Sequence, residues 1–242
     1  MTNSFLYKVN RKLIGQRVGN LWRFSPPYEY VQNITEYNLF RFLGITQSEI
    51  KSWCIVGGYL GNEIPTILRN YPNVRVNVFE CSRRYAGALK RRFAKSERVS
   101  VIEKAVSNSQ GRLKFFETTL KGGGSLLKVG SLARQNYGAE EAEAFEVESV
   151  TLDEALDGLG VDLLQLDVQG AERLVLEGAT KVLETTRAVF TEVSLQSGLY
   201  ENATTLSEIR TLLEGKGFEL ALLGLGTDLT GNALFIRCKN KA

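Results

Sequence analysis

Acidic and amide side chains follow a short apolar run near the middle of the sequence. The run LLQL, residues 163–166, gives way to Asp167, Gln169, Gly170 and Glu172. A carboxylate at the end of a buried strand can remove a proton from a reacting group or hold a charged ligand. The chain contains no histidine, the commonest general base and the commonest metal ligand. Any general base must therefore be Asp, Glu, Tyr or Lys.

A second carboxylate, Glu192, ends the neighbouring apolar run RAVFTEV. We expect Asp167 and Glu192 to project from adjacent strand ends into one cleft, and we predict a catalytic role for both. The pair could hold substrate hydroxyls, share a proton or bind a divalent cation, while Glu192 could instead be structural. Asp167 either takes the proton or orients the cofactor. Glu172 either faces the crevice as a third catalytic candidate or stabilises the N-terminus of the following helix.

The stretch CIVGGYLGNEI joins an apolar run to a helical pattern and supplies a glycine-rich turn. Open α/β sheets bind ligands at such turns, and glycines let a ligand approach the backbone closely. A dinucleotide fingerprint needs glycine in place of Val56, so the turn matches it only in part. An ordinary tight turn is the alternative. We assign cofactor binding to Gly57, Gly58, Tyr59 and Gly61.

Glu80 ends the next apolar run, about twenty residues beyond the turn. A carboxylate there can accept hydrogen bonds from both ribose hydroxyls of NAD or S-adenosylmethionine. Val56 favours S-adenosylmethionine, which has no pyrophosphate to bind at the helix N-terminus. Cys81, which follows Glu80, is assigned to the same cofactor site.

A parallel sheet is needed to bring these side chains together. From residue 52, short apolar runs alternate with longer helical patterns, as in α/β domains. The predicted strands are SWCIVGG, VRVNVFE, RVSVIEKAV, VDLLQLDV and RAVFTEVSL, and the predicted helices end at Asn70 or cover Arg83–Ala94, Ala171–Glu184 and Thr205–Lys216.

Four more strand-like segments accompany this pattern. Gly111–Phe116 and Phe145–Val150 are separated by a long glycine-containing loop, and loops of that length are usually functional or disordered. The tail holds the runs FELALLG and NALFIRC, which we expect to pair antiparallel because only a short turn-rich segment joins them.

From Ser52 to Cys238 the sequence resembles the FkbM family of S-adenosylmethionine-dependent methyltransferases. The resemblance is carried by VESVTLDEALDGLGVDLLQLDVQGAERLVLEGA and FTEVS, with support from EKAVSNSQGRLKFF and SGLYENATTLSEIRTLLEGKGFEL. It implies an α/β class I methyltransferase fold, Rossmann-like, with a seven-stranded sheet whose last strand alone is antiparallel and with helices on both faces. It also implies O-methylation, frequently of sugars in polysaccharides, glycolipids or natural products.

The sequence departs from the family pattern at two positions. Ile55 stands where the family usually has an acid before the glycine turn, and Gln169 stands where it has a glutamate. We hypothesise that Glu63 replaces the lost charge near the amino group of S-adenosylmethionine. The alternative is a solvated glutamate that stabilises its own helix. By analogy with the fold, Lys104 and Ala105 are expected beside the adenine.

We assign Ser125, Gln169 and Tyr200 to the acceptor substrate. The Gly122–Gly124 loop and Ser125 could close over the acceptor, and Tyr200 could offer a stacking surface or a hydroxyl to a sugar ring. A flexible linker and an ordinary core aromatic are the alternatives.

Residues 1–50 are predicted to form a helical N-terminal arm or cap, and residues 51–242 the methyltransferase domain. The arm is basic and either packs on the domain or contacts an anionic membrane or an acidic partner. The net charge of +3 does not suggest nucleic-acid binding. No apolar run is long enough for a membrane span and the N-terminus lacks a signal-peptide core, so we expect a cytoplasmic enzyme. Nothing in the sequence specifies an oligomeric state.

The sequence therefore predicts an S-adenosylmethionine-dependent O-methyltransferase that acts on a hydroxyl of a sugar, glycan or natural product by direct methyl displacement. The alternatives are a methyltransferase of an amine, lipid or protein, and a non-catalytic nucleoside-binding protein. Val56 and the absence of histidine disfavour an NAD-dependent oxidoreductase. No metal site is predicted, because carboxylates alone do not define one and Cys54, Cys81 and Cys238 lack zinc-site spacing.

Overall fold

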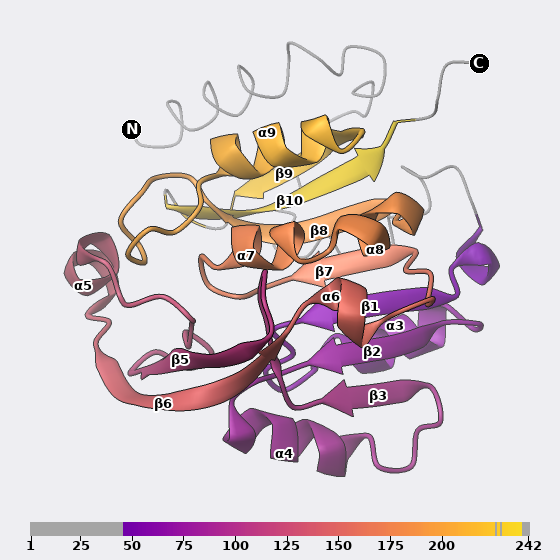
Figure 1. Ribbon diagram of the computed structural model, residues 1–242, viewed down its shortest axis with the longest axis horizontal. Coiled ribbons are helices and arrows are strands. Elements are labelled where there is room, and N and C mark those ends of the chain that lie inside the picture. The colour runs from indigo at the N-terminus through magenta and orange to yellow at the C-terminus, as the bar shows by residue number, and fades with distance from the viewer. Residues whose placement is uncertain (1–45, 226, 228, 239–242) are drawn as a thin grey trace.

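A seven-stranded sheet forms the centre of the protein (Figure 1). The computed structural model describes residues 46–225, 227 and 229–238. The strand order is β3-β2-β1-β7-β8-β10-β9. The strands are β1 (Ser52–Val56), β2 (Arg75–Phe79), β3 (Val99–Ile102), β7 (Leu163–Leu166), β8 (Ala188–Ser194), β9 (Phe218–Leu225) and β10 (Thr230–Arg237).

Only β10 runs against its neighbours in this sheet. The pairs from β3 through β8 are parallel, whereas β10 is antiparallel to both β8 and β9. The last strand therefore inserts between β8 and β9 in the reverse direction. This confirms the predicted α/β class I methyltransferase sheet with a single antiparallel strand at its C-terminus.

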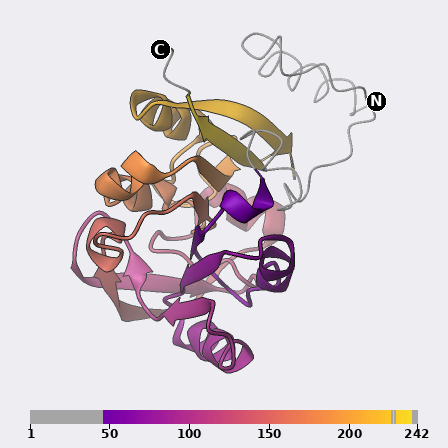
Figure 2. The same cartoon turned by 90° about the vertical axis from the view of Figure 1, so that its right-hand side faces the viewer.

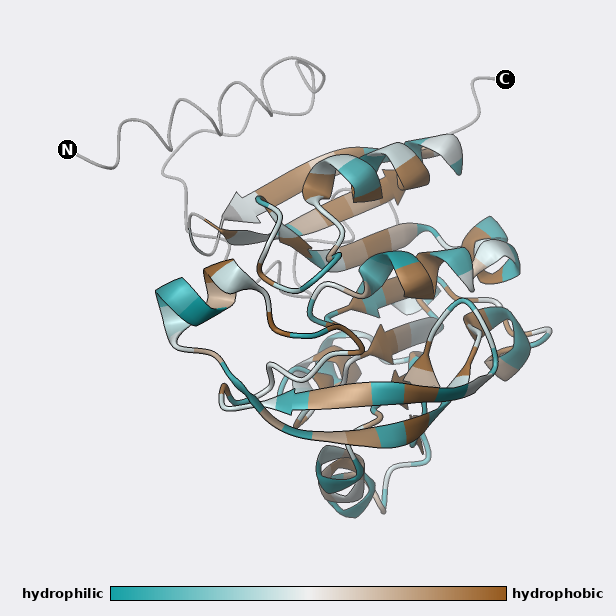
Figure 3. Ribbon diagram, turned by 60° about the vertical axis from the view of Figure 1, so that its left-hand side comes forward, coloured by the Kyte–Doolittle hydropathy of each residue, from teal (hydrophilic) through white to brown (hydrophobic). Residues whose placement is uncertain are grey.

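Helices cover both faces of the sheet, as predicted (Figure 2). One apolar cluster joins Trp53 and Ile55 to α3 (Ile64–Asn70) and α4 (Arg83–Arg92). The other joins Cys54 and Val56 to the four helices from α6 (Leu152–Ala155) to α9 (Leu206–Gly215). This alternation follows from the two-residue period of a strand. Figure 3 shows hydrophobic residues concentrated along the central strands. The helices are η1 (Gln47–Glu49), α3 (Ile64–Asn70), α4 (Arg83–Arg92), α5 (Ser131–Tyr137), α6 (Leu152–Ala155), α7 (Glu172–Glu177), α8 (Thr180–Thr185) and α9 (Leu206–Gly215).

A second, three-stranded sheet lies beside the central one. It consists of β4 (Ala105–Val106), β5 (Gly111–Thr118) and β6 (Glu141–Val150), in the order β4-β6-β5. Its inner side packs Phe115 and Val147 against Cys81 and Leu126. The sequence predicted β5 and β6 but took RVSVIEKAV as one strand. That segment is divided between β3 of the central sheet and β4 of the second sheet, so the prediction of one strand was wrong.

Two other predicted segments also differ from the structure. The helix predicted over Ala171–Glu184 is broken into α7 and α8 at Gly178. A Cβ at Gly178 would lie 2.2 Å from the backbone oxygen of Ser107, so the chain bends where two backbones touch. The long loop between β5 and β6 contains α5, and it pairs with its surroundings through bridges from Ser125 to Phe116 and from Val129 to Tyr200.

The register of β7 and β8 aims two carboxyl side chains in one direction. Gln165 pairs with Phe190 and Leu166 with Thr191, so the next positions in line are Asp167 and Glu192. Leu163 and Phe190 belong to the cluster on the α3 side. Because side chains alternate along strands, Asp167 and Glu192 continue toward that same side at the carboxyl ends of their strands.

Among the described residues, no helix has the length and apolar character of a membrane span. The predicted N-terminal arm lies almost entirely outside the described part of the chain, which begins at residue 46.

Candidate active site

The turn after β1 lies against the end of β7. The backbone N–H of Asp167 donates to the carbonyl of Val56 at 2.9 Å. Gly57 has φ +88°, and a Cβ there would lie 1.8 Å from the backbone oxygen of Asp167. Only glycine fits this position, because any side chain would collide with backbone. The glycine turn and the Asp167 strand end therefore form one continuous floor.

Glu80 organises the wall opposite Asp167. Its carboxylate accepts hydrogen bonds from the backbone N–H groups of Tyr59 and Ser82, both at 2.8 Å. Glu80 is 8% exposed, and burial raises its pKa to about 7 despite these hydrogen bonds. Tyr59 has φ +43°, which is strained for a bulky residue. Such strain is common at ligand-binding sites.

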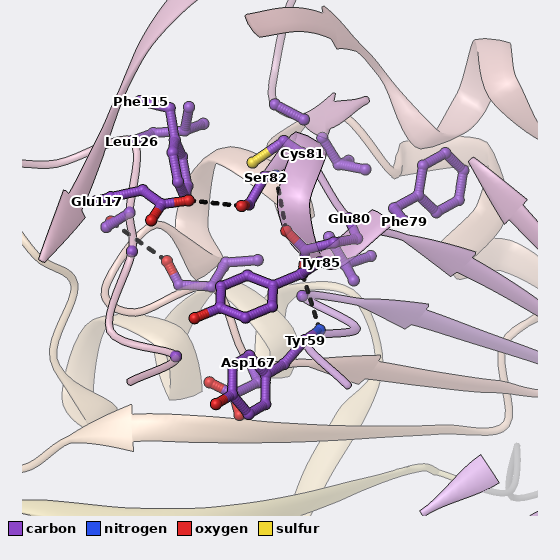
Figure 4. Close-up of a pocket in the computed structure, with 18 of the residues that line it drawn as sticks. Tyr59, Phe79, Glu80, Cys81, Ser82, Tyr85, Phe115, Glu117, Leu126 and Asp167 are labelled. Atoms are coloured by element: carbon purple, nitrogen blue, oxygen red, sulfur yellow. Dashed lines mark hydrogen bonds between the residues drawn. The ribbon is translucent and has the colours of Figure 1, made fainter. Parts of the chain in front are cut away.

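A pocket opens between the central sheet and the second sheet (Figure 4). It contains about 740 Å³ of space not filled by protein atoms, part of which is open solvent. Figure 4 shows Asp167 and Tyr59 near one end, Phe115 and Leu126 near the other, and Glu80 between them. Eight of the predicted site residues line it: Gly57, Tyr59, Glu80, Cys81, Lys104, Ala105, Ser125 and Asp167.

Two predicted cofactor glycines lie behind the pocket. Gly58 and Gly61 pack toward Leu89 of α4 and do not line the pocket. At both positions an added Cβ would collide with neighbouring side chains, so the glycines let the turn pack closely against α4. The pocket lining therefore contains the first glycine of the turn and Tyr59, but not the other two glycines.

The second sheet contributes lining residues that the sequence analysis missed. Glu117 of β5 accepts a hydrogen bond from the Ser82 hydroxyl at 2.5 Å, and both residues line the pocket. Tyr85 of α4 meets the Tyr59 ring edge-on at a centroid distance of 4.6 Å. Ser82 was detectable as a helix-start residue two positions after Glu80. Glu117 had no such signal, because its place depends on how the second sheet docks.

A polar network joins Asp167 to Glu192. The side-chain amide of Gln169 donates to Asp167 Oδ1 and to Glu192 Oε2, both at 2.6 Å. The Tyr200 hydroxyl lies 2.9 Å from Gln169 Oε1 and 2.9 Å from the carbonyl of Gly123. The structure thus brings together four predicted residues, three of which do not line the pocket itself.

Burial raises the pKa of both Asp167 and Glu192. The Asp167 side chain has a surface that solvent can reach, but many protein atoms surround it. The resulting partial loss of hydration raises the pKa of Asp167. Burial and the negative charges of Asp167 and Glu172 raise the pKa of Glu192 well above its ordinary value. The hydrogen bonds from the Gln169 amide lower the pKa of both carboxyls. Burial thus favours the protonated form of both carboxyls, and the Gln169 amide opposes this effect.

Glu172 is turned back onto the loop that precedes it. Its Oε1 accepts hydrogen bonds from the backbone N–H groups of Val168 at 3.3 Å and Gly170 at 3.2 Å. The residue is 3% exposed and does not line the pocket. Burial raises the pKa of Glu172 to about 7. Its observed contacts stabilise the turn that presents Asp167.

Glu63 precedes α3 and lies close enough to Asp167 for the two charges to interact. It is half-buried, burial raises its pKa, and it makes no helix-capping hydrogen bond. Ile55, at the position of the missing acid, is fully buried in the same cluster as Ile64. An acid at position 55 and the carboxylate of Glu63 would thus lie on the same side of the sheet.

The residues assigned to the acceptor hold the loop in place. Ser125 is buried, and its hydroxyl lies 2.9 Å from the carbonyl of Gln169. The Tyr200 ring is buried beside Val129 and Leu199, so its hydroxyl rather than its ring face reaches the network. No three Cys, Asp or Glu side chains in the described ranges are grouped to hold a metal ion.

Replacing Glu172 with Gln should change how stability depends on pH. The fold favours protonated Glu172, so its contribution to stability is complete below the ordinary pKa of 4.5 and is lost as pH rises through about 7. Gln can still accept the two backbone hydrogen bonds but does not titrate. Relative to wild type, Glu172→Gln should gain up to about 3 kcal/mol of unfolding free energy across this window.

Urea unfolding at several pH values measures this difference, and Glu184→Gln, an exposed position on α8, is the control. If the difference in unfolding free energy between Glu172→Gln and the wild type does not change with pH, the raised pKa of Glu172 is contradicted.

Sequence comparison places the chain in a known family. The family described as the methyltransferase FkbM domain matches residues 63–220. The 2-O-methyltransferase NoeI of Sinorhizobium fredii (strain NBRC 101917 / NGR234) is 30% identical over 170 residues. The aligned part covers 66% of this chain and 69% of NoeI.

Structure comparison gives more distant likenesses. A SAM-dependent methyltransferase from Aquifex aeolicus has a TM-score of 0.46 at 10% identity, covering 84% of this chain and 89% of that chain. An O-methyltransferase family protein from Burkholderia thailandensis has a TM-score of 0.46 at 12% identity, covering 81% of this chain and 53% of that chain.

The donor set of the pocket suits S-adenosylmethionine, the predicted cofactor. Glu80 offers a buried carboxylate at the end of β2, as a ribose diol requires, and Phe115 and Leu126 offer apolar surface for a nucleobase. Asp167 adds negative charge for a cationic ligand. The match over residues 63–220 shows that the chain is a member of the FkbM family of S-adenosylmethionine-dependent methyltransferases.

Proposed function

We propose that this protein transfers a methyl group to a hydroxyl of a sugar, glycan or natural product, with Asp167 as the proton acceptor. One observation carries the proposal: Asp167 lines the pocket and also takes part in the polar network of Gln169 and Glu192. Among the predicted catalytic residues, Asp167 is the one that both lines the pocket and belongs to this network. The 2-O-methyltransferase relative supports an oxygen acceptor.

The chemistry requires alignment and proton removal. When bound, S-adenosylmethionine supplies an electrophilic methyl group on a sulfonium. The acceptor oxygen forms the new C–O bond as the C–S bond breaks, and the hydroxyl proton passes to Asp167. A general base of this kind typically contributes 10²–10⁴-fold in rate. Asp167 lines the pocket and Glu192 does not, so Asp167 is the member of the pair placed to accept the proton.

The cofactor residues have distinct proposed tasks. Glu80 binds the ribose hydroxyls, and the backbone around Lys104 and Ala105 borders the base. Glu63 binds the amino group of the methionine part, in place of the acid missing at Ile55. We assign the acceptor to the polar side of the crevice, where the Gly122–Gly124 loop meets Tyr200 through the contact at Gly123.

The acceptor class is tested by incubating the protein with isotopically labelled S-adenosylmethionine and a panel of sugars, oligosaccharides, amines and lipids. Mass spectrometry should find the methyl group on a hydroxyl oxygen. Asp167→Asn should lower turnover by about 10²–10⁴-fold, because Asn cannot accept the proton. Asp157→Asn, at an exposed position, is the matched control. Methylation confined to nitrogen, or full turnover in Asp167→Asn, would contradict the proposal.

Glu80→Gln should weaken binding of S-adenosylhomocysteine by about tenfold or more, because charged hydrogen bonds to the ribose are lost. In the wild type, affinity should fall as pH drops below about 7, where the Glu80 carboxylate takes up a proton. Calorimetry measures both effects, with the exposed Glu97→Gln as control. An unchanged dissociation constant in Glu80→Gln would exclude the ribose assignment.

Glu63→Gln distinguishes binding of the methionine part of the cofactor from binding of its nucleoside part. It should weaken S-adenosylhomocysteine binding by about tenfold, through loss of a charge-assisted bond to the amino group. Binding of 5′-methylthioadenosine, which lacks the amino-acid part, should not change. Calorimetry with the two ligands makes each the control for the other. Equal effects on both ligands, or none on either, would refute the role of Glu63.

A further inference from the structure

The backbone of Gln169 is held in a conformation that non-glycine residues rarely adopt. Its φ is +55°, and Gly170 follows with φ +94°. The Ser125 hydroxyl lies 2.9 Å from the Gln169 carbonyl, and the Glu172 carboxylate binds the N–H of Gly170. Left-handed backbone at a large side chain costs free energy and persists where the surroundings enforce it. Here it turns the Gln169 side chain between two carboxyl groups.

The amide of Gln169 is matched to its three partners. Both carboxyl partners are bound through Nε2, which has two hydrogens, and Oε1 faces the Tyr200 hydroxyl. The reverse orientation of the amide would set its oxygen against the acceptor oxygens of Asp167 and Glu192. The network therefore defines the amide orientation. A glutamate at this position would offer acceptor oxygens where two N–H bonds are now made.

We propose that Gln169 is a positioning residue that holds the Asp167 and Glu192 carboxyls side by side and keeps Asp167 available to accept a proton. This inference rests on the proposed role of Asp167 as proton acceptor. It gives Gln169 a task different from the substrate contact expected from the sequence. It also explains how this chain works with an amide where the family it resembles carries a glutamate.

The surroundings of Asp167 make this amide important. Four titratable groups interact electrostatically with Asp167: Glu63 before α3, Glu172 of α7, Glu192 of β8 and Tyr200. None of these groups can bring a positive charge to Asp167, whose pKa is raised by burial. The Gln169 hydrogen bond opposes this effect by lowering the pKa of Asp167. Its removal should raise the pH at which Asp167 becomes a free carboxylate.

Two variants test this idea, Gln169→Glu and Gln169→Met. Gln169→Glu removes both N–H bonds and adds a charge, whereas Gln169→Met removes the bonds without adding charge. Gln110→Glu, in an exposed turn, controls for the added charge. The Asp167 carboxyl is followed by carbon-13 NMR across a pH titration, with Asp167→Asn used to assign its signal. This readout needs no acceptor and so is independent of the proposed function.

Both variants should move the Asp167 titration upward by about one pH unit, and Gln169→Glu by more than Gln169→Met. With an acceptor, the acid side of the turnover profile should move by the same amount, while affinity for S-adenosylhomocysteine stays within about twofold. An Asp167 titration at the wild-type pH in either folded variant would overturn the inference. Shifted titration without detectable transfer to any hydroxyl would preserve it and count against the proposed function instead.

Discussion

The contact between the ends of β1 and β7 is the constraint on which the site depends. The parallel pairing of these strands ends with the hydrogen bond from Asp167 to Val56, and Gly57 then passes against the Asp167 carbonyl. This close approach requires glycine and leaves no room for a side chain at position 57. It also sets the glycine turn and the proposed base at a fixed separation. A substitution at Gly57 would therefore displace both.

Charge is the second organising feature of the site. Burying carboxyl groups is costly unless they are hydrogen-bonded, protonated or met by opposite charge. Gln169 supplies hydrogen bonds to Asp167 and Glu192, the turn backbone supplies them to Glu172, and burial raises the pKa of Glu192. S-adenosylmethionine carries a sulfonium and an ammonium group, so its arrival would offset the remaining negative charge. The crevice is thus better suited to a cationic ligand than to an anionic one.

The sequence was sufficient to predict what depends on local pattern. Strand alternation and the parallel order placed Asp167 and Glu192 at neighbouring strand ends, and spacing identified Glu80. It was insufficient where tertiary contacts decide. The split of RVSVIEKAV between two sheets follows from docking of the second sheet, which also brings Glu117 to the pocket. The amide bridge of Gln169 depends on its left-handed backbone, which an ordinary glutamine in a sequence does not signal.

In the proposed reaction Asp167 faces the acceptor hydroxyl rather than serving only to hold the cofactor. A crystal structure of the protein with S-adenosylhomocysteine and its acceptor tests this most directly. We predict an Asp167 carboxylate oxygen within about 2.6–3.2 Å of the acceptor hydroxyl, the range needed for proton transfer. An Asp167 whose two oxygens both bind the methionine part, with the acceptor hydroxyl directed to another group, would contradict the account.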